Sequence, residues 1–306
     1  MNLRRLRRRS NLFKPHNLLT ITVKHNNTMT KLDLQEVTNS FRASDPDLTE
    51  EHEATKSLST TKTSKETAST TSPPFRFVPL TMGGRGRTHV VSQASASLID
   101  EVTLDDLKKM TEGFYQKAFQ DVTLDKFIRS HGDDHGGRFA KWIHQKLSGS
   151  KVWDQDRRDR DKTPVEVADG YRHVVHDRSS AHVAAWYSPK RPSSEVGQHF
   201  KLDECRVWMR LHFWAMRESG IMEKSPSFAD YYVRFIGHFV RVYESSAPMF
   251  ARESLRWSAN PSNTEEYIAN GRVMKDVLGV SLEDAAKELP EAEANDYVWP
   301  YNQTVQ

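Results

Sequence analysis

The chain has 306 residues, which is enough for one or two domains. Hydrophobic residues make up 37% of it and charged residues 28%, an apolar content too low for a chain that folds along its whole length. The net charge is only +3, which argues against a nucleic-acid-binding surface. A single cysteine, Cys205, excludes intrachain disulfides and a four-thiolate metal cluster, and it is compatible with a reducing compartment. With no run of ~18 apolar residues, we expect no membrane span.

The first part of the chain, residues 1–94, shows no sustained apolar periodicity. Its Ser/Thr/Lys tract at 55–74 offers too little apolar surface to offset the entropy of ordering, so we predict a disordered, low-complexity arm. Residues 1–31 carry many arginines and lysines and no acid, as organelle transit peptides do. We expect a cytoplasmic protein, or a mitochondrial or plastid one if residues 1–31 are a true transit peptide.

Helical patterns begin near residue 100. Residues 103–121 start with a capping residue and predict one helix, or two short ones that meet near Gly113. Residues 138–147 repeat the periodicity. The stretch 148–200 is charged and predicts irregular loops, with 154–162 as a solvated loop.

Two longer helices follow. Residues 202–218 have a broad apolar face, with Asp203 placed to cap the start and Gly220 to end the helix. Residues 228–243 carry apolar side chains at i, i+3, i+4 and i+7, typical of a helix with one buried face. We therefore predict an all-α domain over 95–258, followed by a C-terminal extension, 259–306, that is partly helical.

The segment HDRSSAHVAAW (176–186) lies between the predicted loops. It holds two histidines six residues apart, a spacing that suits neither a zinc finger nor a metalloprotease helix. Long loops inside a compact domain usually serve a function. The neighbouring segments must therefore decide what His176 and His182 do.

The order of the segments resembles the truncated haemoglobins, over about residues 100–245. The similarity is carried by GFYQKAFQDVTLDKFI, RFAKWIHQKLSG, HDRSSAHVAAW and ECRVWMRLHF. Two features depart from that family: SGS (148–150) replaces its usual Gly-Gly turn, and both loops beside His182 are longer than expected. The longer second loop makes His199 a rival for the proximal position.

The resemblance implies a two-over-two helical sandwich, a globin-like fold, around a non-covalent haem b (iron protoporphyrin IX). It implies an imidazole as the axial iron ligand, and we favour His182 over His199 and His176. It also implies hydrogen-bond donors on the opposite face, a dry aromatic wall and a cation for a haem propionate. The expected donors are Tyr115, His135 and Trp208. The expected dry wall consists of Phe127, Phe139 and Trp142, and the expected cation is Arg178.

The function that the resemblance implies is reversible binding of O2, NO or CO through iron. One alternative is a haem enzyme, an NO dioxygenase or peroxidase-like protein, which would need an external reductase. A third hypothesis is a helical interaction module, or one whose His173, His176 and His182 bind another metal without haem. The sequence leaves the oligomeric state open.

Overall fold

The computed structural model describes residues 73–84, 88–160, 162–170, 172–175 and 177–301. Within these ranges the chain is mostly helical, which confirms the all-α prediction. The two strand pairs are only two residues per strand and antiparallel: β1 (Met82–Gly83) with β2 (Thr88–His89), and β3 (Val165–Glu166) with β4 (Arg172–His173). None of the described helices has the length and apolar content needed to cross a membrane.

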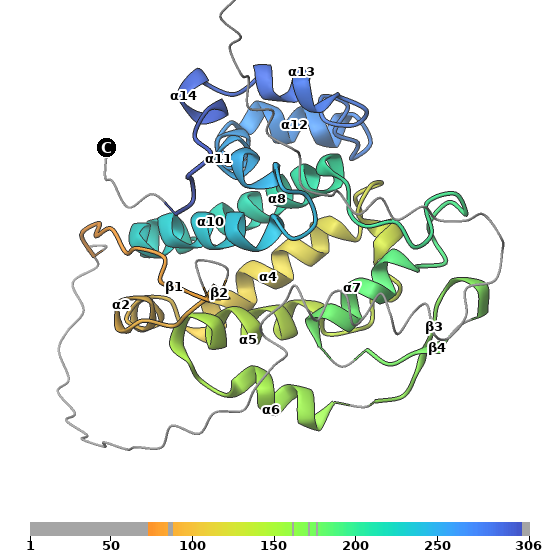
Figure 1. Cartoon of the computed structure of the whole chain (residues 1–306), viewed down its shortest axis with the longest axis horizontal. Helices are drawn as coiled ribbons and strands as arrows, with labels where there is room; N and C mark the ends of the chain where they lie inside the picture. Colours follow the sequence, from red (N-terminus) through yellow and green to blue (C-terminus); the bar gives the residue numbers. More distant parts are fainter. Residues whose placement is uncertain (1–72, 85–87, 161, 171, 176, 302–306) are drawn as a thin grey trace, which may run out of the picture.

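The order of the helices along the chain is shown by colour in Figure 1. They are α2 (Gln93–Ala96), α3 (Leu98–Glu101), α4 (Leu104–Ala118), α5 (His135–Ser148), α6 (Val152–Asp159), α7 (Arg178–Trp186), α8 (Leu202–Glu218), α9 (Ile221–Lys224), α10 (Pro226–Val240), α11 (Ala247–Trp257), α12 (Pro261–Ala269), α13 (Leu282–Lys287) and α14 (Glu291–Ala294), with 3-10 helices η2 (Asp125–Phe127) and η3 (Ala168–Gly170).

Helix α4 is one helix and does not divide at Gly113. Thr103 begins it: the Asp106 amide donates to Thr103 Oγ1 at 3.3 Å, and the Thr103 amide donates to Asp106 Oδ2 at 2.9 Å. Such a reciprocal capping box satisfies amides that the first turn leaves unpaired. The glycine faces α8, where a Cβ would lie 3.9 Å from that of Ala215. An added methyl group would make an ordinary van der Waals contact there, so packing against α8 does not require glycine at this position.

Helix α5 begins three residues earlier than predicted. The Asp134 carboxylate accepts the Gly137 amide at 2.8 Å, and Gly149 ends the helix with a φ of +73°. The early start brings His135 into the helix. It also sets the first turn directly against α4, since the Thr111 hydroxyl donates to the Gly136 carbonyl at 2.7 Å.

Helix α8 has the predicted bounds, but its predicted cap is wrong. Asp203 lies inside the first turn, and its carboxylate accepts the Gly279 amide at 2.8 Å. The start is stabilised by Glu204, whose carboxylate accepts the Lys201 amide at 2.8 Å. Gly220 follows the last turn with a φ of +82°, as predicted for a helix end.

The stretch 148–200 is not entirely irregular, because it contains α6 and α7. The predicted solvated loop is helical from Val152 to Asp159 and keeps no buried side chain. The ion pair of Asp156 with Lys141, at 2.5 Å, connects this helix to α5, while a second pair, with Arg160, lies within the end of α6. Sequence patterns missed α6 because it lacks an apolar face.

Residues 73–84 and 88–94 pack against the helical core, so the predicted boundary of the arm at residue 94 is wrong. Val78 and Leu80 are buried. Arg234 of α10 donates to the Val78 carbonyl at 2.8 Å. The folded unit thus begins before Val78, and the disorder predicted for residues 1–72 lies outside the described residues.

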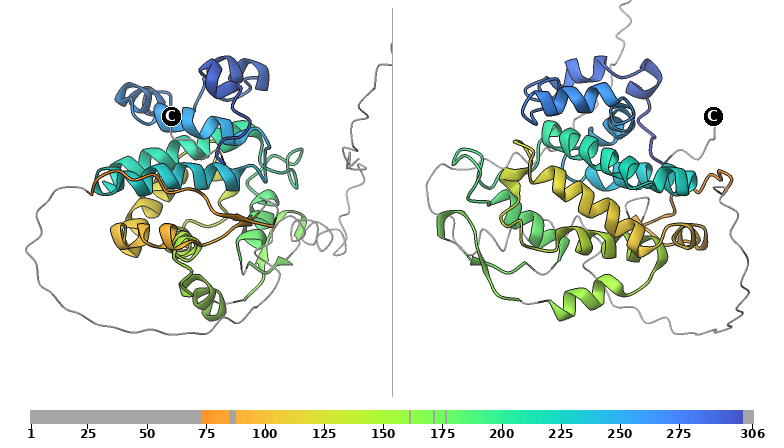
Figure 2. Two further views of the ribbon diagram at one scale, coloured as in Figure 1. Left: turned by 60° about the vertical axis from the view of Figure 1, so that its left-hand side comes forward. Right: turned by 180° about the vertical axis from the view of Figure 1, so that it is seen from behind.

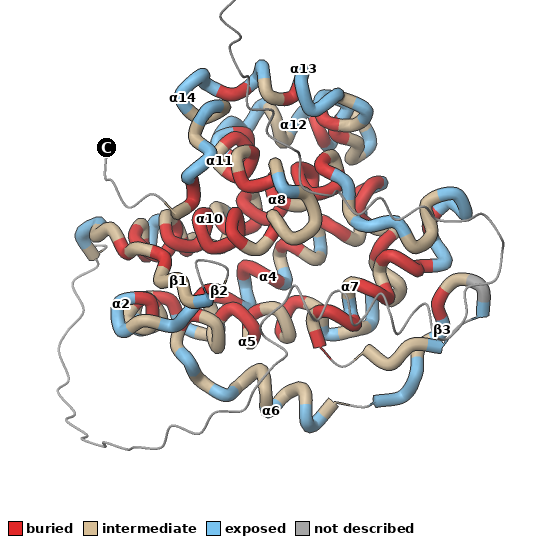
Figure 3. The backbone as a smooth tube through the Cα atoms, viewed as in Figure 1, coloured by how far each residue is buried: buried red, intermediate tan, exposed pale blue. Residues whose placement is uncertain are grey.

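The C-terminal extension packs on the domain through α12, α13 and the segments around them. Figures 1 and 2 agree that α11 to α14 lie on the α8 and α10 side, with α6 at the opposite end. Tyr267, Met274 and Val277 are buried there, and Trp299 lies against Gly237 of α10. The buried backbone in Figure 3 is concentrated in α4, α5, α8 and α10, which therefore form the core.

Replacing Leu80 by alanine tests whether the segment before α2 belongs to the folded unit. Leu80 is 4% exposed, so we expect a loss of about 2–5 kcal/mol in the free energy of unfolding, measured by urea denaturation. Phe75 is 57% exposed, and Phe75→Ala should change it by less than about 0.5 kcal/mol. Equal, negligible effects of both changes would contradict the packing.

Candidate functional site

A cavity of about 270 Å³ lies between α4, α5, α7, α8 and the end of α10. A single water molecule needs only ~15 Å³, so this is a ligand-sized space and not a packing defect. Its wall includes all eight residues that the sequence singled out, which come from four helices and η2: Tyr115, Phe127, His135, Phe139, Trp142, Arg178, His182 and Trp208.

The helical repeat explains why these residues meet. Each helix presents one face to the cavity, with side chains at i, i+3, i+4 and i+7. The faces consist of His135, Arg138, Phe139 and Trp142 in α5, of Arg178, Ala181, His182 and Ala185 in α7, and of Ile236, Phe239, Val240 and Tyr243 at the end of α10. A residue's place in its own helix therefore determines whether it reaches the cavity.

Helix α7 holds His182 in place. Its first turn is fixed by Asp177, whose carboxylate accepts the Ser180 amide at 2.8 Å, while Ser180 Oγ accepts the Asp177 amide at 2.9 Å. His182 is half-buried, with Nδ1 2.5 Å from Tyr243 Oη. Its ring meets that of Phe200 edge-on, with centroids 5.7 Å apart. The imidazole is thus held on two sides while it lines the cavity.

The other two histidines considered from the sequence are not placed in this way. His199 is exposed, does not line the cavity, and stacks on Trp186 with ring centroids 4.1 Å apart. His176 lies outside the described residues. The preference for His182 over His199 therefore gains geometric support.

Tyr115 of α4 and Trp208 of α8 also line the cavity, and each carries a polar group. Burial raises the pKa of Tyr115 to about 12, while the positive charge of Arg138 acts the other way, so the hydroxyl stays protonated at neutral pH. In the described part of the chain, neither Tyr115 Oη nor Trp208 Nε1 has a hydrogen-bond partner. Both groups can donate to a molecule in the cavity.

His135 also faces the cavity, stacked on Tyr115 with ring centroids 5.0 Å apart. Its Nε2 lies 2.8 Å from the Ser130 carbonyl oxygen, which can only accept, so Nε2 carries a proton and donates it there. Burial lowers the pKa of His135, which favours the neutral ring. The neutral ring then turns a lone pair on Nδ1, not an N–H, to its other side.

Aromatic rings form most of the remaining wall. Phe127, Phe139 and Trp142 have the positions expected of a dry wall, and Phe139 lies 6.0 Å from Trp208 between ring centroids. Trp153 and Phe200 extend this wall. Sequence reasoning missed those two because both come from segments predicted as loops.

Three arginines line the cavity: Arg138, Arg160 and Arg178. The Arg178 guanidinium lies over two rings, 5.4 Å from the Trp142 centroid and 5.0 Å from that of Phe239. Arg138 makes no ion pair within the described ranges. It was missed, although the 135–142 stripe would have placed it on the same face as His135.

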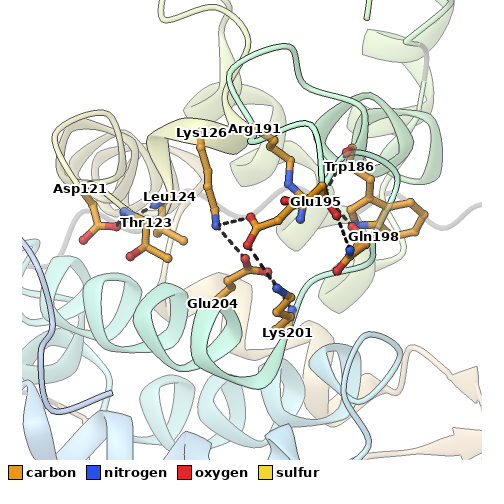
Figure 4. A network of polar contacts seen from close by, with 11 residues as sticks. Asp121, Thr123, Leu124, Lys126, Trp186, Arg191, Glu195, Gln198, Lys201 and Glu204 are labelled. Carbon is orange, nitrogen blue, oxygen red and sulfur yellow. Dashed lines mark hydrogen bonds and ion pairs between the residues drawn. The ribbon is translucent and has the colours of Figure 1, made fainter. Parts of the chain in front are cut away.

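A charged network lies beside η2, and Figure 4 shows it from close by; its Glu204 lines the cavity. Lys126 Nζ lies 3.0 Å from Glu204 Oε1 and 3.1 Å from Glu195 Oε2. Lys126 also lowers the pKa of Glu195 through this hydrogen bond. Arg191 donates to the carbonyls of Trp186 and Gln198, at 2.9 and 2.7 Å. These bonds tie the 188–200 loop to η2 and to the start of α8.

Behind Trp208 stands His212, which is completely buried in α8. The two rings are parallel, with centroids 4.7 Å apart and planes at 3°. His212 Nε2 lies 2.8 Å from the Tyr232 hydroxyl of α10. Burial lowers the pKa of His212 to about 3, so the ring is neutral and supports Trp208 without a competing charge.

Among the described residues, no group of three or more His, Cys, Asp or Glu side chains is arranged to hold a metal ion. His173 Nε2 lies 3.1 Å from the Ser180 carbonyl oxygen and donates to it. Burial raises the pKa of the Cys205 thiol, which lines the cavity in its protonated form. Comparison with known protein families, curated proteins and solved structures finds no match.

Because burial lowers the pKa of His212, this residue lowers the free energy of unfolding at acid pH. Between about pH 6.5, where an unfolded histidine titrates, and about pH 3, only the unfolded chain binds this proton. Its effect on the free energy of unfolding is therefore absent above that window, grows by about 1.4 kcal/mol per pH unit as the pH falls through it, and is constant below about pH 3. We expect His212→Leu to make the slope of stability against pH shallower by about that amount, measured by urea denaturation. An unchanged slope would contradict the burial.

Proposed function

We propose that the protein is a globin-like protein that holds haem b in this cavity and reversibly binds O2, NO or CO. One observation carries the proposal: eight residues chosen from the sequence for haem-related roles, spread from Tyr115 to Trp208, all line a single cavity. Their separation along the chain makes this grouping a product of the fold. The absence of a matching relative leaves the proposal to rest on the chain's own residues.

The chemistry of the wall fits the group. Haem is a flat apolar ring with two carboxylates at one edge and an iron that needs an axial ligand. The cavity offers an imidazole from His182, aromatic rings on several sides, and guanidinium groups that match carboxylates. Arg178 is the proposed cation for one propionate. Arg138 makes no ion pair in the described ranges and is therefore suited to the second propionate.

The arrangement of the helices supports the finer fold proposal as well. Helices α4 and α5 pack together, and α8 lies against α4. Helix α8 is joined to α10 by the 2.8 Å contact of His212 Nε2 with the Tyr232 hydroxyl, and α11 packs against both helices. The pairs α4–α5 and α8–α10 would be the two layers of the sandwich. Helices α6 and α11 to α14 would then be additions outside that frame.

Within this proposal each side chain has a distinct task. The iron would supply reversible coordination of a diatomic molecule. His182 holds the cofactor, while the Tyr115 hydroxyl and the Trp208 indole N–H donate hydrogen bonds to the ligand. The ring of His135 stacks on Tyr115 and orients it. Phe127, Phe139 and Trp142 exclude water, which strengthens the polar contacts that remain.

A haem enzyme is the second candidate, favoured by the two donors that are open to the cavity. Donors that polarise a bound diatomic molecule also promote its chemistry, such as NO dioxygenation or a peroxidase-like reaction. An external reductase would return the electrons. Turnover of NO by the oxygenated protein, faster than its spontaneous oxidation, separates this function from reversible binding.

The His182→Ala variant tests the proposed iron ligand. We expect reconstituted wild-type protein to show an intense Soret band and His182→Ala to lose it, because the imidazole is the only proposed bond to iron. His199→Ala serves as the matched control and should keep the band, since His199 stacks outside the cavity. Loss of the pigment only in His199→Ala would reverse the assignment.

The Tyr115→Phe variant tests the opposite wall. It removes one hydrogen bond of about 1–1.5 kcal/mol but keeps the ring that stacks on His135. Loaded protein should therefore release dioxygen roughly 10-fold faster, measured by stopped-flow displacement with CO. An unaltered release rate would remove Tyr115 from the proposed ligand contacts.

A further inference from the structure

We infer that Tyr243 is the positioning residue of the proposed iron ligand: its phenol oxygen accepts the Nδ1 proton of His182 and so directs Nε2 to the metal. This inference rests on the proposed function and deepens it. Nothing in the sequence singled out Tyr243, because its position in the 228–243 stripe is typical of an ordinary core residue.

The geometry of the pair is specific. Tyr243 lies just after α10, on the face that also sends Ile236, Phe239 and Val240 to the cavity. Its Oη is 2.5 Å from His182 Nδ1, and the two rings stand at 89° with centroids 5.1 Å apart. Phe200 packs edge-on against both rings, with centroids 5.2 Å from Tyr243 and 5.7 Å from His182. The three rings together fix the plane of the imidazole.

Proton accounting assigns a direction to this hydrogen bond. A neutral imidazole carries one N–H, and the nitrogen that binds a metal must offer its lone pair. With iron at Nε2, the proton is on Nδ1, and Nδ1–H donates to Tyr243 Oη. The phenol stays neutral and no proton leaves the pair. The contact with Tyr243 thus selects the tautomer that binds metal.

The chemical consequence follows from the acceptor. A partner on the non-ligating nitrogen fixes the ring orientation and raises the basicity of the ligating one. Tyr243 follows the end of α10 and His182 lies in α7, so the bond also joins the loop-flanked helix to the segment after α10. Tyr243 therefore acts on iron through His182 and is a positioning residue, although it also touches the cavity.

Tyr243→Phe tests this inference, because it removes the oxygen and keeps the ring. We expect the ferrous protein to keep a Soret band, with the iron–histidine stretching band in resonance Raman spectra shifted to lower wavenumber. Transfer of haem to excess apomyoglobin should be about 10- to 100-fold faster. Tyr187→Phe is the matched control. Tyr187 is buried in a hydrophobic cluster with Val183 and Ala184 of α7 but does not line the cavity, so neither the stretching band nor the rate of haem transfer should change.

A second variant separates hydrogen bonding from packing. Tyr243→Gln offers an amide oxygen as a new acceptor and should shift the stretching band back towards its wild-type position. If Tyr243→Phe has a Soret band and an unshifted iron–histidine stretching band, the inference is wrong while the proposed function stands. Wild-type protein without any Soret band would overturn both the inference and the proposed function.

Discussion

The close contact between α4 and the first turn of α5 is the constraint on which the rest of the site depends. A Cβ on Gly136 would lie 2.9 Å from the Glu112 backbone, so only glycine permits this approach, and the Thr111 hydroxyl secures it with a 2.7 Å bond to the Gly136 carbonyl. The contact sets the His135 ring on that of Tyr115. It thereby fixes the position of the α5 side chains that line the cavity. The cavity between these two helices, α7, α8 and the end of α10 is lined but not filled by aromatic side chains.

Electrostatics divide this cavity into two kinds of surface. The titratable groups of the apolar wall, and His212 behind it, are neutral: burial lowers the pKa of His135 and of His212 and raises that of Tyr115. Charges are instead carried by Arg138, Arg160 and Arg178 on the lining and by the pairs that Lys126 makes with Glu195 and Glu204. A ligand with an apolar body and an anionic edge matches this division. His182 and Tyr243 form a further polar contact on the lining, with Nδ1 and Oη 2.5 Å apart.

Much of the helical framework could be predicted from the sequence. The bounds of α8 were predicted to the residue, and α4 and α10 were close, because a strong apolar period marks a helix that packs on a core. The failures share a cause. Helix α6 has no buried face, so apolar periodicity did not detect it. In α7 the sequence signal is the capping box of Asp177 and Ser180, which periodicity does not detect either. Val78 and Leu80 were assigned to the arm because two buried side chains in a short extended segment create no period.

The sequence by itself determined the helical class of the domain and which faces of α4, α5 and α8 are apolar, since these depend on residues close together in the chain. Only the tertiary structure decided that His182 and not His199 lines the cavity. The same is true of Arg160 on the lining and of Tyr243 as the partner of His182. Tyr243 and His182 are separated by 61 positions, and the contact exists because the fold brings the residues just after α10 beside α7. Local patterns carry no information on such a contact, which depends on how the helices pack as a whole.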